Sequence, residues 1–286
     1  MKECAPIIFI GMHRSGTSMI GRLLEDMGLF VGTRKEDNNE AMFFQRLNEW
    51  IMAQCGARWD TPQATQYLWR NGELLTWIDD YIRQLLDGPR AIQFIGLRHY
   101  LTTGGITKLN FPWGWKDPRN TFTLPVWLRI FPEAKVICIE RHGVDVAQSL
   151  RVRSWEGFAC TTRKYRKYRP IVSVRPKRGG FIESPRCASL EGGLSLWREY
   201  MDQAQQVMQQ LPGHRVLKLR YEQVLVDPVP HIMASAEFCG IDKEKQKFEE
   251  LIAGINGSRA YSYLNDPGLR DFARAHQATL VNCGYE

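Results

Sequence analysis

The sequence predicts a three-layer α/β fold, in which a central, mostly parallel sheet is flanked by helices and carries a helical cap. Two short apolar runs, Ile7–Ile10 and Lys135–Glu140, are long enough for buried strands and too short for helices. Each run is followed by a stretch whose apolar residues recur at helical spacing. Strands that alternate with helices in this way are typical of parallel βαβ units, whose ligands lie at the carboxyl ends of the strands.

Turn residues divide the remaining chain into elements of the same two kinds. Gly28, Asp87–Pro89 and Gly104–Gly105 interrupt the first half, and Pro132 and Pro228 interrupt the second. The C-terminal stretch, with Gly257 and Pro267, is expected to be irregular. The predicted strands are Ile7–Ile10, Trp113–Lys116, Lys135–Glu140 and Arg215–Leu219. The predicted helices are Thr17–Met27, Ala41–Met52, Leu74–Leu86, Leu124–Ile130, Val144–Val152, Leu190–Leu211, Val229–Cys239 and Glu244–Ile252.

The sequence favours a single domain, residues 1–286, because it contains no internal repeat and no low-complexity linker. Helices at about 39–90 are predicted to form the cap, with most of their apolar side chains packed in the core. A basic loop is expected at about 160–188, because Pro170, Pro176 and Gly179–Gly180 oppose one continuous helix.

The composition is that of a globular protein with a basic surface. Hydrophobic residues make up 44% of the chain, and 38 basic against 31 acidic residues give a net charge of +7, which favours an anionic ligand or partner. No apolar run approaches the ~20 residues that span a bilayer, and the first run meets His13 and Arg14 too early for a signal peptide. The seven cysteines are scattered and form no C-x-x-C pair, so we expect reduced thiols in a cytoplasmic protein.

The segment from Ile7 to Leu24 carries the first functional signal. Its spacing, Gly11-x-x-x-x-Gly16-Thr17-Ser18, is that of a Walker A loop between a strand and a helix, which predicts a P-loop-like fold. Thr17 stands where the phosphate-binding lysine is expected, and the fixed positive charge of the loop is Arg14, whose guanidinium can bind two oxygens of one group. The loop therefore favours a phosphate-like anion over a magnesium triphosphate.

The segment Arg163–Arg178 carries the second signal. It holds eight basic residues, no acidic residue and two interleaved tyrosines, Tyr165 and Tyr168. One interpretation is an exposed loop whose charges are simply solvated. The other is a clamp for an anionic acceptor or for a nucleotide.

Three motifs, in order along the chain, resemble those of the sulfotransferases that use 3′-phosphoadenosine-5′-phosphosulfate (PAPS). Residues 12–18, MHRSGTS, are similar to the loop of that family for the 5′-phosphosulfate. Residues 140–149, ERHGVDVAQS, are similar to its 3′-phosphate motif, and residues 220–228, RYEQVLVDP, to its Y-E-D-L-x-x-D-P element. Residues 115–119, WKDPR, also resemble the family, and the resemblance extends from about Ile7 to Gly240.

The resemblance implies a role for each matching residue. Arg141 and Ser149 would bind the 3′-phosphate, Tyr221 would lie near the adenine, and Lys116 would lie near the transferring group. Lys116 and Arg14 would neutralise the charge that develops on the leaving phosphate, with adenosine 3′,5′-bisphosphate as product and no metal required. The cradle of the 5′-phosphosulfate would consist of Arg14, Ser15, Gly16, Thr17 and Ser18.

The catalytic base is where the sequence departs from its relatives. Pro118 occupies the place of a histidine base found in some of them, and Gln45 follows the run in which others carry a glutamate. The candidates here are His13, which precedes Arg14 in the loop, and Glu40, with His99 and Asp117 as further possibilities. Two other departures are His142-Gly143, where Asp-Pro is commoner, and Gln223, which replaces an aspartate.

The leading hypothesis is a metal-independent sulfotransferase that acts on a hydroxyl acceptor, with a glycan or small metabolite favoured over a protein and an anionic acceptor compatible with the basic segment. No zinc-type cluster of ligands is present in the sequence. A P-loop kinase is the alternative enzyme, and Thr17 argues against it. A nucleotide- or nucleic-acid-binding module is the alternative without catalysis, but no nucleic-acid partner is expected, because the basic segment lacks a recognisable binding fold around it. The sequence does not indicate the oligomeric state.

Overall fold

The computed structural model describes residues 3–177, 179–241, 252 and 254–285. Arg178 of the basic segment and most of the helix predicted at Glu244–Ile252 lie outside these residues. Packing divides the chain into two compact units, Met1–Arg141 with Tyr200–Tyr261 and His142–Glu199 with Ser262–Glu286. That the chain forms a single domain stays a prediction.

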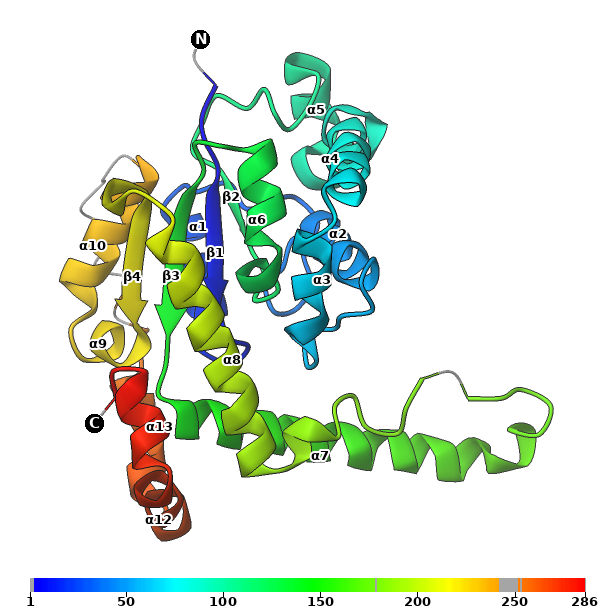
Figure 1. Ribbon diagram of the computed structural model, residues 1–286, viewed down its shortest axis with the longest axis vertical. Coiled ribbons are helices and arrows are strands. Elements are labelled where there is room, and N and C mark those ends of the chain that lie inside the picture. The colour runs from blue at the N-terminus through cyan, green and yellow to red at the C-terminus, as the bar shows by residue number, and fades with distance from the viewer. Residues whose placement is uncertain (1–2, 178, 242–251, 253, 286) are drawn as a thin grey trace. The chain divides into compact units, whose positions relative to one another are not determined.

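The first unit contains a parallel sheet of four strands in the order β2-β1-β3-β4 (Figure 1). The strands predicted from the apolar runs are confirmed to within one residue at each end, and β3 begins and ends where the sequence predicts. Because all four strands are parallel, their carboxyl ends lie at one edge of the sheet. The strands are β1 Ile7–Gly11, β2 Gly114–Lys116, β3 Lys135–Glu140 and β4 Val216–Arg220.

Alternate residues of the central strands enter two separate cores. Ile7 and Phe9 of β1 pack with α1 (Thr17–Asp26) and α10 (Pro228–Cys239) on one face of the sheet. Ile8 and Ile10 pack on the other face with α2 (Met42–Ala53), α4 (Gly72–Asp87) and α6 (Asn120–Ile130). This period of two is the geometry of a strand that is buried on both faces, and it explains why the strands read as unbroken apolar runs.

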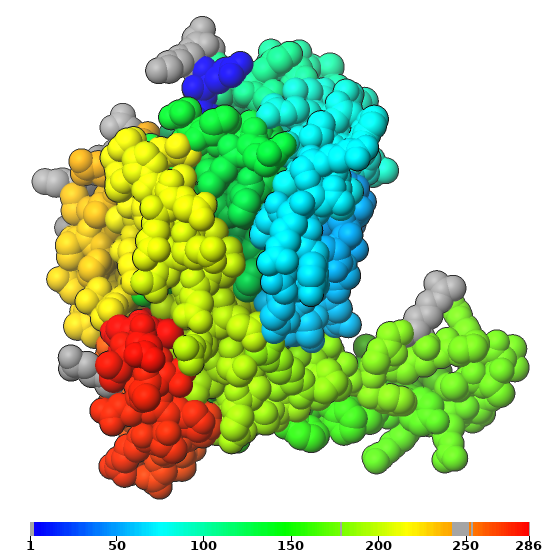
Figure 2. Space-filling model, in the orientation of Figure 1, coloured from blue at the N-terminus to red at the C-terminus, as the bar shows by residue number. Residues whose placement is uncertain are grey.

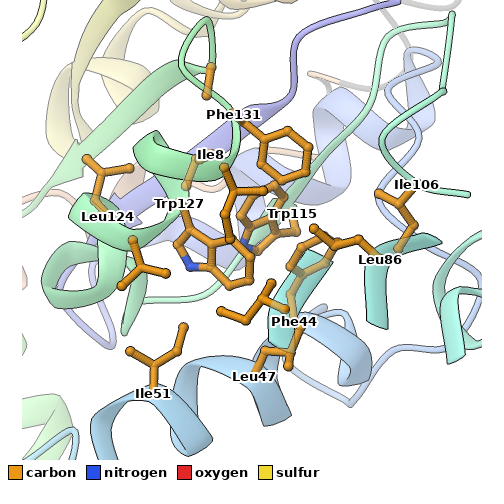
Figure 3. Close-up of a cluster of buried hydrophobic side chains, with 14 of the residues drawn as sticks. Ile8, Phe44, Leu47, Ile51, Leu86, Ile106, Trp115, Leu124, Trp127 and Phe131 are labelled. Atoms are coloured by element: carbon orange, nitrogen blue, oxygen red, sulfur yellow. The ribbon is translucent and has the colours of Figure 1, made fainter. Parts of the chain in front are cut away.

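The larger core is rich in aromatic rings. Phe44 of α2 stacks on Trp115 of β2, with ring centroids 3.9 Å apart, and Trp127 of α6 meets both rings edge-on (Figure 3). The predicted cap helices thus share the core of the sheet, and the space-filling view shows their blue and cyan segments packed against the green segment that follows them in the chain (Figure 2). Among the described residues of this unit, the sequence did not predict the α-helices α3 Thr65–Trp69, α5 Ile92–Thr103 and α9 Tyr221–Val226.

The second unit is built on α7 (Gly143–Tyr168) and the N-terminal half of α8 (Leu190–Gln209). Gly143 and Gly193 let the two helices approach closely, because a Cβ at Gly143 would lie 2.8 Å from Trp197 and one at Gly193 would lie 3.0 Å from Ala147. Asp145 of α7 accepts hydrogen bonds from the backbone of Ser262 and Tyr263, which fastens the C-terminal segment to α7.

Two expectations for the second unit were wrong. The helix predicted at Val144–Val152 continues to Tyr168, so the basic loop begins after Tyr168 and not near residue 160. The reason is that residues 158–168 contain neither proline nor glycine, and the basic side chains among them are good helix formers. The C-terminal stretch is not irregular, since it forms α12 (Pro267–Ala275), which Asp266 caps and Pro267 begins, and α13 (Gln277–Asn282).

All seven cysteines are free thiols, as the sequence predicts. Burial raises the pKa of the Cys138 thiol well above its ordinary value and that of Cys239 to about 12. Both thiols lie in the cores that cover the sheet, so their contribution is to packing. Within the described residues, no helix is long and apolar enough to cross a membrane.

Candidate functional site

The loop between β1 and α1 has the strand–loop–helix geometry that its spacing predicts. Gly11 has φ +133° and Gly16 has φ +90°, and Arg14 adopts the left-handed region with φ +69°. The Thr121 hydroxyl accepts a hydrogen bond from the Gly11 N–H at 3.0 Å, which fixes the start of the loop. No side chain caps the N-terminus of α1, whose first N–H groups have no acceptor within the helix, so the loop leaves these donors for an anion.

Tyr221 and Arg141 pack against this loop from the ends of β4 and β3. The Tyr221 ring occupies the space beside Gly16, where a Cβ would lie only 2.1 Å from the ring. Arg141 lies over the same ring, 4.8 Å from its centroid, and donates a hydrogen bond to the Arg14 carbonyl at 3.2 Å. Three strand ends thereby meet at one place, beside an exposed arginine, Arg14, and a half-buried one, Arg141.

A buried ion pair lies at the end of the neighbouring strand β2. Lys116, the last residue of β2, donates to Glu40 with 3.0 Å between Nζ and Oε1, and both side chains are more than nine-tenths buried. Lys116 pairs in register with Phe9 of β1, and its Cβ lies 3.9 Å from the position of a Cβ on Gly21 of α1. The ion pair is therefore next to α1, at the same edge of the sheet as the loop.

The segment that carries Glu40 is anchored to α1 and α2. Ser18 donates to the Asn38 carbonyl at 2.7 Å, and Arg22 donates to the Asp37 carbonyl at 2.7 Å. Gln45 of α2 donates to Glu40 Oε2 at 3.3 Å. These contacts hold the Glu40 carboxylate between α1, α2 and β2 without any secondary structure of its own.

Behind the pair, a network of buried polar groups supports Lys116. Arg119 contacts Asp117 at 3.1 Å, Glu49 at 2.9 Å and, more distantly, Glu40 at 3.6 Å. Asn48 donates to Asp117 at 2.8 Å. Burial raises the pKa of Asp117 to about 6. The positive charge of Arg119 opposes this rise, whereas the negative charge of Glu40 adds to it. Burial alone would lower the pKa of Arg119, but the surrounding carboxylates raise it, so the guanidinium stays charged.

The structure separates the four candidates for the base. Glu40 accepts a hydrogen bond from Lys116. Asp117 belongs to the buried polar network and accepts a hydrogen bond from Asn48. His13 is buried in the loop, with its ring centroid 4.8 Å from that of Trp59 and 6.2 Å from that of Tyr200. His99 on α5 packs against Phe30 and Phe111; Phe111 precedes β2, whereas Lys116 ends it, so His99 lies toward the opposite end of the strand.

The predicted site residues of the first unit converge, with the exception of His99. The loop residues 13–18, Arg141 and Tyr221 form one group, and Lys116 with Glu40 forms a second group beside it. Ser149 lies on α7 in the second unit and is half-buried.

Sequence reasoning missed the network behind Lys116. The spacing of Lys116, Asp117 and Arg119 is visible in the sequence, but nothing in it shows that Arg119 turns back onto Asp117. One feature of the sequence could have drawn attention to Asn48: it is a polar residue beside Leu47 on the apolar face of a predicted helix. In the structure Asn48 is fully buried. Its partners come from a segment about 70 residues away, which local patterns do not reveal.

Comparison with known proteins gives one family and a set of similar folds. A model described as the sulfotransferase family matches residues 6–245. No curated protein matches the sequence. The sulfotransferase domain from the curacin biosynthetic pathway is 14% identical, with 100% of this chain and 99% of that chain covered and a TM-score of 0.52. Sulfotransferase STF1 from Mycobacterium tuberculosis H37Rv is 13% identical, with 96% of this chain and 76% of that chain covered and a TM-score of 0.50.

The two kinds of similarity support different statements. Identities this low show that the fold is shared and no more. The family model is independent of them and spans most of the sequence, including the loop, the Glu40 segment, β2 and β3. The chain therefore belongs to the sulfotransferase family, whose members transfer sulfo groups.

Proposed function

We propose that this protein transfers a sulfo group from PAPS to a hydroxyl acceptor, with Glu40 as the general base. The observation that carries the proposal is the buried Glu40–Lys116 pair beside a phosphate-type loop that lacks the Walker lysine. The Glu40 carboxylate can take a proton, and the Lys116 ammonium can neutralise negative charge. The two groups are 3.0 Å apart. The alternative P-loop kinase is not supported by the family to which the chain belongs.

The residues of the loop fit the 5′-phosphosulfate end of PAPS. Arg14 is exposed, and the uncapped N-terminus of α1 offers N–H groups to an anion. We assign the cradle to Arg14, Ser15, Gly16, Thr17 and Ser18. Arg141 and Ser149 are proposed for the 3′-phosphate, and Tyr221, which fixes Arg141 against the loop, for the adenine side.

The transfer step balances without a covalent enzyme intermediate. The acceptor oxygen forms a bond to sulfur, the bond between sulfur and the phosphate oxygen breaks, and its electron pair stays on the phosphate of adenosine 3′,5′-bisphosphate. Glu40 takes the proton of the hydroxyl, and Lys116 and Arg14 meet the charge that develops on the leaving phosphate. Such a step depends on alignment and charge stabilisation, which residues held by buried contacts can provide without a metal.

The acceptor class follows from the same chemistry. A hydroxyl group is the nucleophile that a carboxylate base can activate, and the net charge of +7 favours acceptors that are themselves anionic. We propose a glycan or another small hydroxylated metabolite over a protein.

The test is a transfer assay with PAPS and a library of hydroxylated glycans and metabolites, read by mass spectrometry for the added sulfo group. We expect sulfated product together with adenosine 3′,5′-bisphosphate, unchanged by a chelator of divalent metals. Adenosine 3′,5′-bisphosphate in place of PAPS serves as the donor blank. Failure to bind PAPS, or transfer that stops without magnesium, would contradict the proposal.

A further inference from the structure

Asn39, which no part of the proposed mechanism uses, is a buried side chain with an unsatisfied donor. It is 6% exposed, and within the described part of the chain its Nδ2 makes no hydrogen bond. Leaving a buried amide donor unpaired costs on the order of 1–3 kcal/mol, so a group of this kind calls for a partner that is not part of the protein.

The contacts of Asn39 place its amide beside α1 and close to Lys116. Nδ2 lies 3.6 Å from the position of a Cβ on Gly21, and the Lys116 Cβ lies 3.9 Å from the same position. Because Cα–Cβ bonds of a helix tilt toward its N-terminus, this position lies toward Thr17, one turn earlier on the same face of α1. The next residue in the chain is Glu40. The amide thus lies beside the first two turns of α1, near the Lys116 side chain, and Glu40 is its neighbour in the chain.

The backbone of Asn39 is held in an uncommon conformation. Its φ is +63°, in the left-handed region, and its N–H donates to the Glu36 carbonyl at 2.9 Å. Asparagine tolerates this region better than most residues, so its conformational tolerance alone could account for its presence. Glycine would satisfy that requirement equally well without an amide, and this difference separates the two explanations.

Resting on the proposed function, we infer that Asn39 Nδ2 donates a hydrogen bond to an oxygen of the sulfo group during transfer. The sulfo oxygens are acceptors only, and an uncharged donor can bind them without competing with Lys116 for the Glu40 carboxylate. A donor held by the fold toward developing charge stabilises the transition state more than the ground state. Asn39 is then a contact to the sulfo group itself, distinct from the loop that holds the phosphates.

The inference makes a sharp distinction between two ligands. PAPS carries the sulfo group, whereas adenosine 3′,5′-bisphosphate lacks it. Removal of the Asn39 amide should therefore impair transfer from PAPS and spare the binding of adenosine 3′,5′-bisphosphate.

The experiment compares Asn39→Gly and Asn39→Asp with the wild type. Glycine keeps the left-handed backbone and removes the donor, and aspartate keeps the shape and replaces the donor by an acceptor. We expect kcat/KM for PAPS to fall about 10²-fold in Asn39→Gly and at least as far in Asn39→Asp, the size seen when one such donor is removed. The Kd of adenosine 3′,5′-bisphosphate, from calorimetry, should change less than about threefold, since a change of that size is under 1 kcal/mol.

Each outcome is informative. Undiminished transfer by Asn39→Gly would overturn the inference and leave only the conformational role, with the proposed function intact. Equal losses in transfer and in adenosine 3′,5′-bisphosphate affinity would also overturn it, because they would indicate a disturbed loop. A wild type that transfers no sulfo group from PAPS would overturn the proposed function and this inference together. Thermal unfolding of each variant checks that the fold is retained, and Asn39→Asp decides the matter if Asn39→Gly does not fold.

Discussion

At the scale of single residues, the chemistry that we propose depends on Glu40 and Lys116, which are 76 positions apart in the chain. A buried carboxylate and ammonium each lose solvation, and only their close contact and further hydrogen bonds offset that loss. Here Gln45 and Arg119 supply the further contacts to Glu40. These contacts hold the pair in place, as the proposed role of Glu40 as base requires.

Replacement of Glu40 by glutamine should remove the base. Glutamine keeps the size and a hydrogen bond acceptor for Lys116, and it cannot take the proton of the acceptor hydroxyl. We expect kcat to fall by ~10²–10⁴ with the affinity for adenosine 3′,5′-bisphosphate nearly unchanged, measured by steady-state kinetics and calorimetry. His13→Ala is the matched comparison, and a larger loss of kcat in that variant would transfer the role of base to His13.

Asp117 should make the stability of the protein depend on pH. Its pKa is raised to about 6 in the folded chain, above the value of 3.8 for a free side chain. A carboxyl group with a raised folded pKa stabilises the fold fully below its unfolded pKa, and this contribution is lost as the pH rises through the folded pKa. The Asp117→Asn variant has no ionisable group at this position, so this contribution to the pH dependence of stability is absent from it.

The free energy of unfolding of the wild type, relative to that of Asp117→Asn, should thus decrease between about pH 4 and pH 7. Urea unfolding of both proteins at several pH values measures it. A difference that is constant with pH, or that rises with it, would show that Asp117 keeps an ordinary or lowered pKa in the folded protein.

At the scale of elements, the strand–loop–helix unit is fitted to its neighbours through glycine. Gly11 and Gly16 have positive φ, and each lies where a Cβ would collide with another element, the Ile139 carbonyl of β3 and the Tyr221 ring. The glycines are required by packing as well as by backbone conformation. The absence of a Cβ at Gly11 and Gly16 lets the end of β1 pack closely against β3 and against Tyr221, which follows β4.

Gly16→Ala should damage the loop more than an unfavourable φ alone would. The left-handed region costs a non-glycine residue about 1–2 kcal/mol, and the new Cβ would also lie 2.1 Å from Tyr221. Gly56→Ala is the control, because Gly56 has φ +71° and open space around it. We expect urea unfolding to show a larger loss of stability for Gly16→Ala than for Gly56→Ala, with weaker binding of adenosine 3′,5′-bisphosphate. Equal losses would mean that Tyr221 moves aside easily.

The basic segment, residues 163–177 and Arg178, combines the end of α7 with the chain that follows it. Its described cations are all exposed, and the half-buried Tyr165 packs edge-on against Phe181 of the returning chain with centroids 5.2 Å apart. We propose that this segment attracts an anionic acceptor. Exposed charges act through solvent, so the effect should be screened by salt within ~8–10 Å.

A variant with Arg163, Lys164, Arg166 and Lys167 changed to glutamine should raise the KM for an anionic acceptor and weaken its dependence on salt. Glutamine is a good helix former, so α7 should persist. The control changes four exposed cations elsewhere, Arg46, Arg70, Arg98 and Lys108, and alters the net charge equally. If both variants raise KM alike, the segment has no special role and only the net charge matters.

At the scale of the whole molecule, the proposed donor site should couple ligand binding to folding. A ligand that binds only the folded chain stabilises it by about 2.7 kcal/mol at a concentration of 100 Kd. Arg141 connects the loop to Tyr221 and is proposed for the 3′-phosphate, so this stabilisation should depend on it.

Adenosine 3′,5′-bisphosphate should thus raise the Tm of the wild type without magnesium, and AMP at the same concentration should raise it much less. In Arg141→Ala the difference between the two ligands should disappear, since loss of one partner of a desolvated charge pair costs on the order of 2–5 kcal/mol. Thermal scans with each ligand measure this directly. Equal shifts by both ligands in the wild type would contradict the assignment of a 3′-phosphate site.

The sequence by itself determined the elements that depend on neighbouring residues. The apolar runs of β1 and β3, the spacing of Gly11 and Gly16 and the order of the three motifs define the parallel sheet, the loop and the family. These features are local because strand burial and glycine conformation depend on a few adjacent residues. The predictions were wrong where prolines were taken as evidence against a helix. This happened at the end of α7 and at Pro267, which begins α12.

Only the tertiary structure decided what surrounds Glu40, Asn39 and Asn48. Each owes its surroundings to residues that are distant in sequence, Lys116 for Glu40, Gly21 for Asn39 and Asp117 for Asn48. The sequence left both His13 and Glu40 as candidates for the base, and the buried contact with Lys116 is the reason that we propose Glu40. The physical reason is that the state of a buried polar group depends on its partners, and the folding of separate segments onto one sheet edge supplies them.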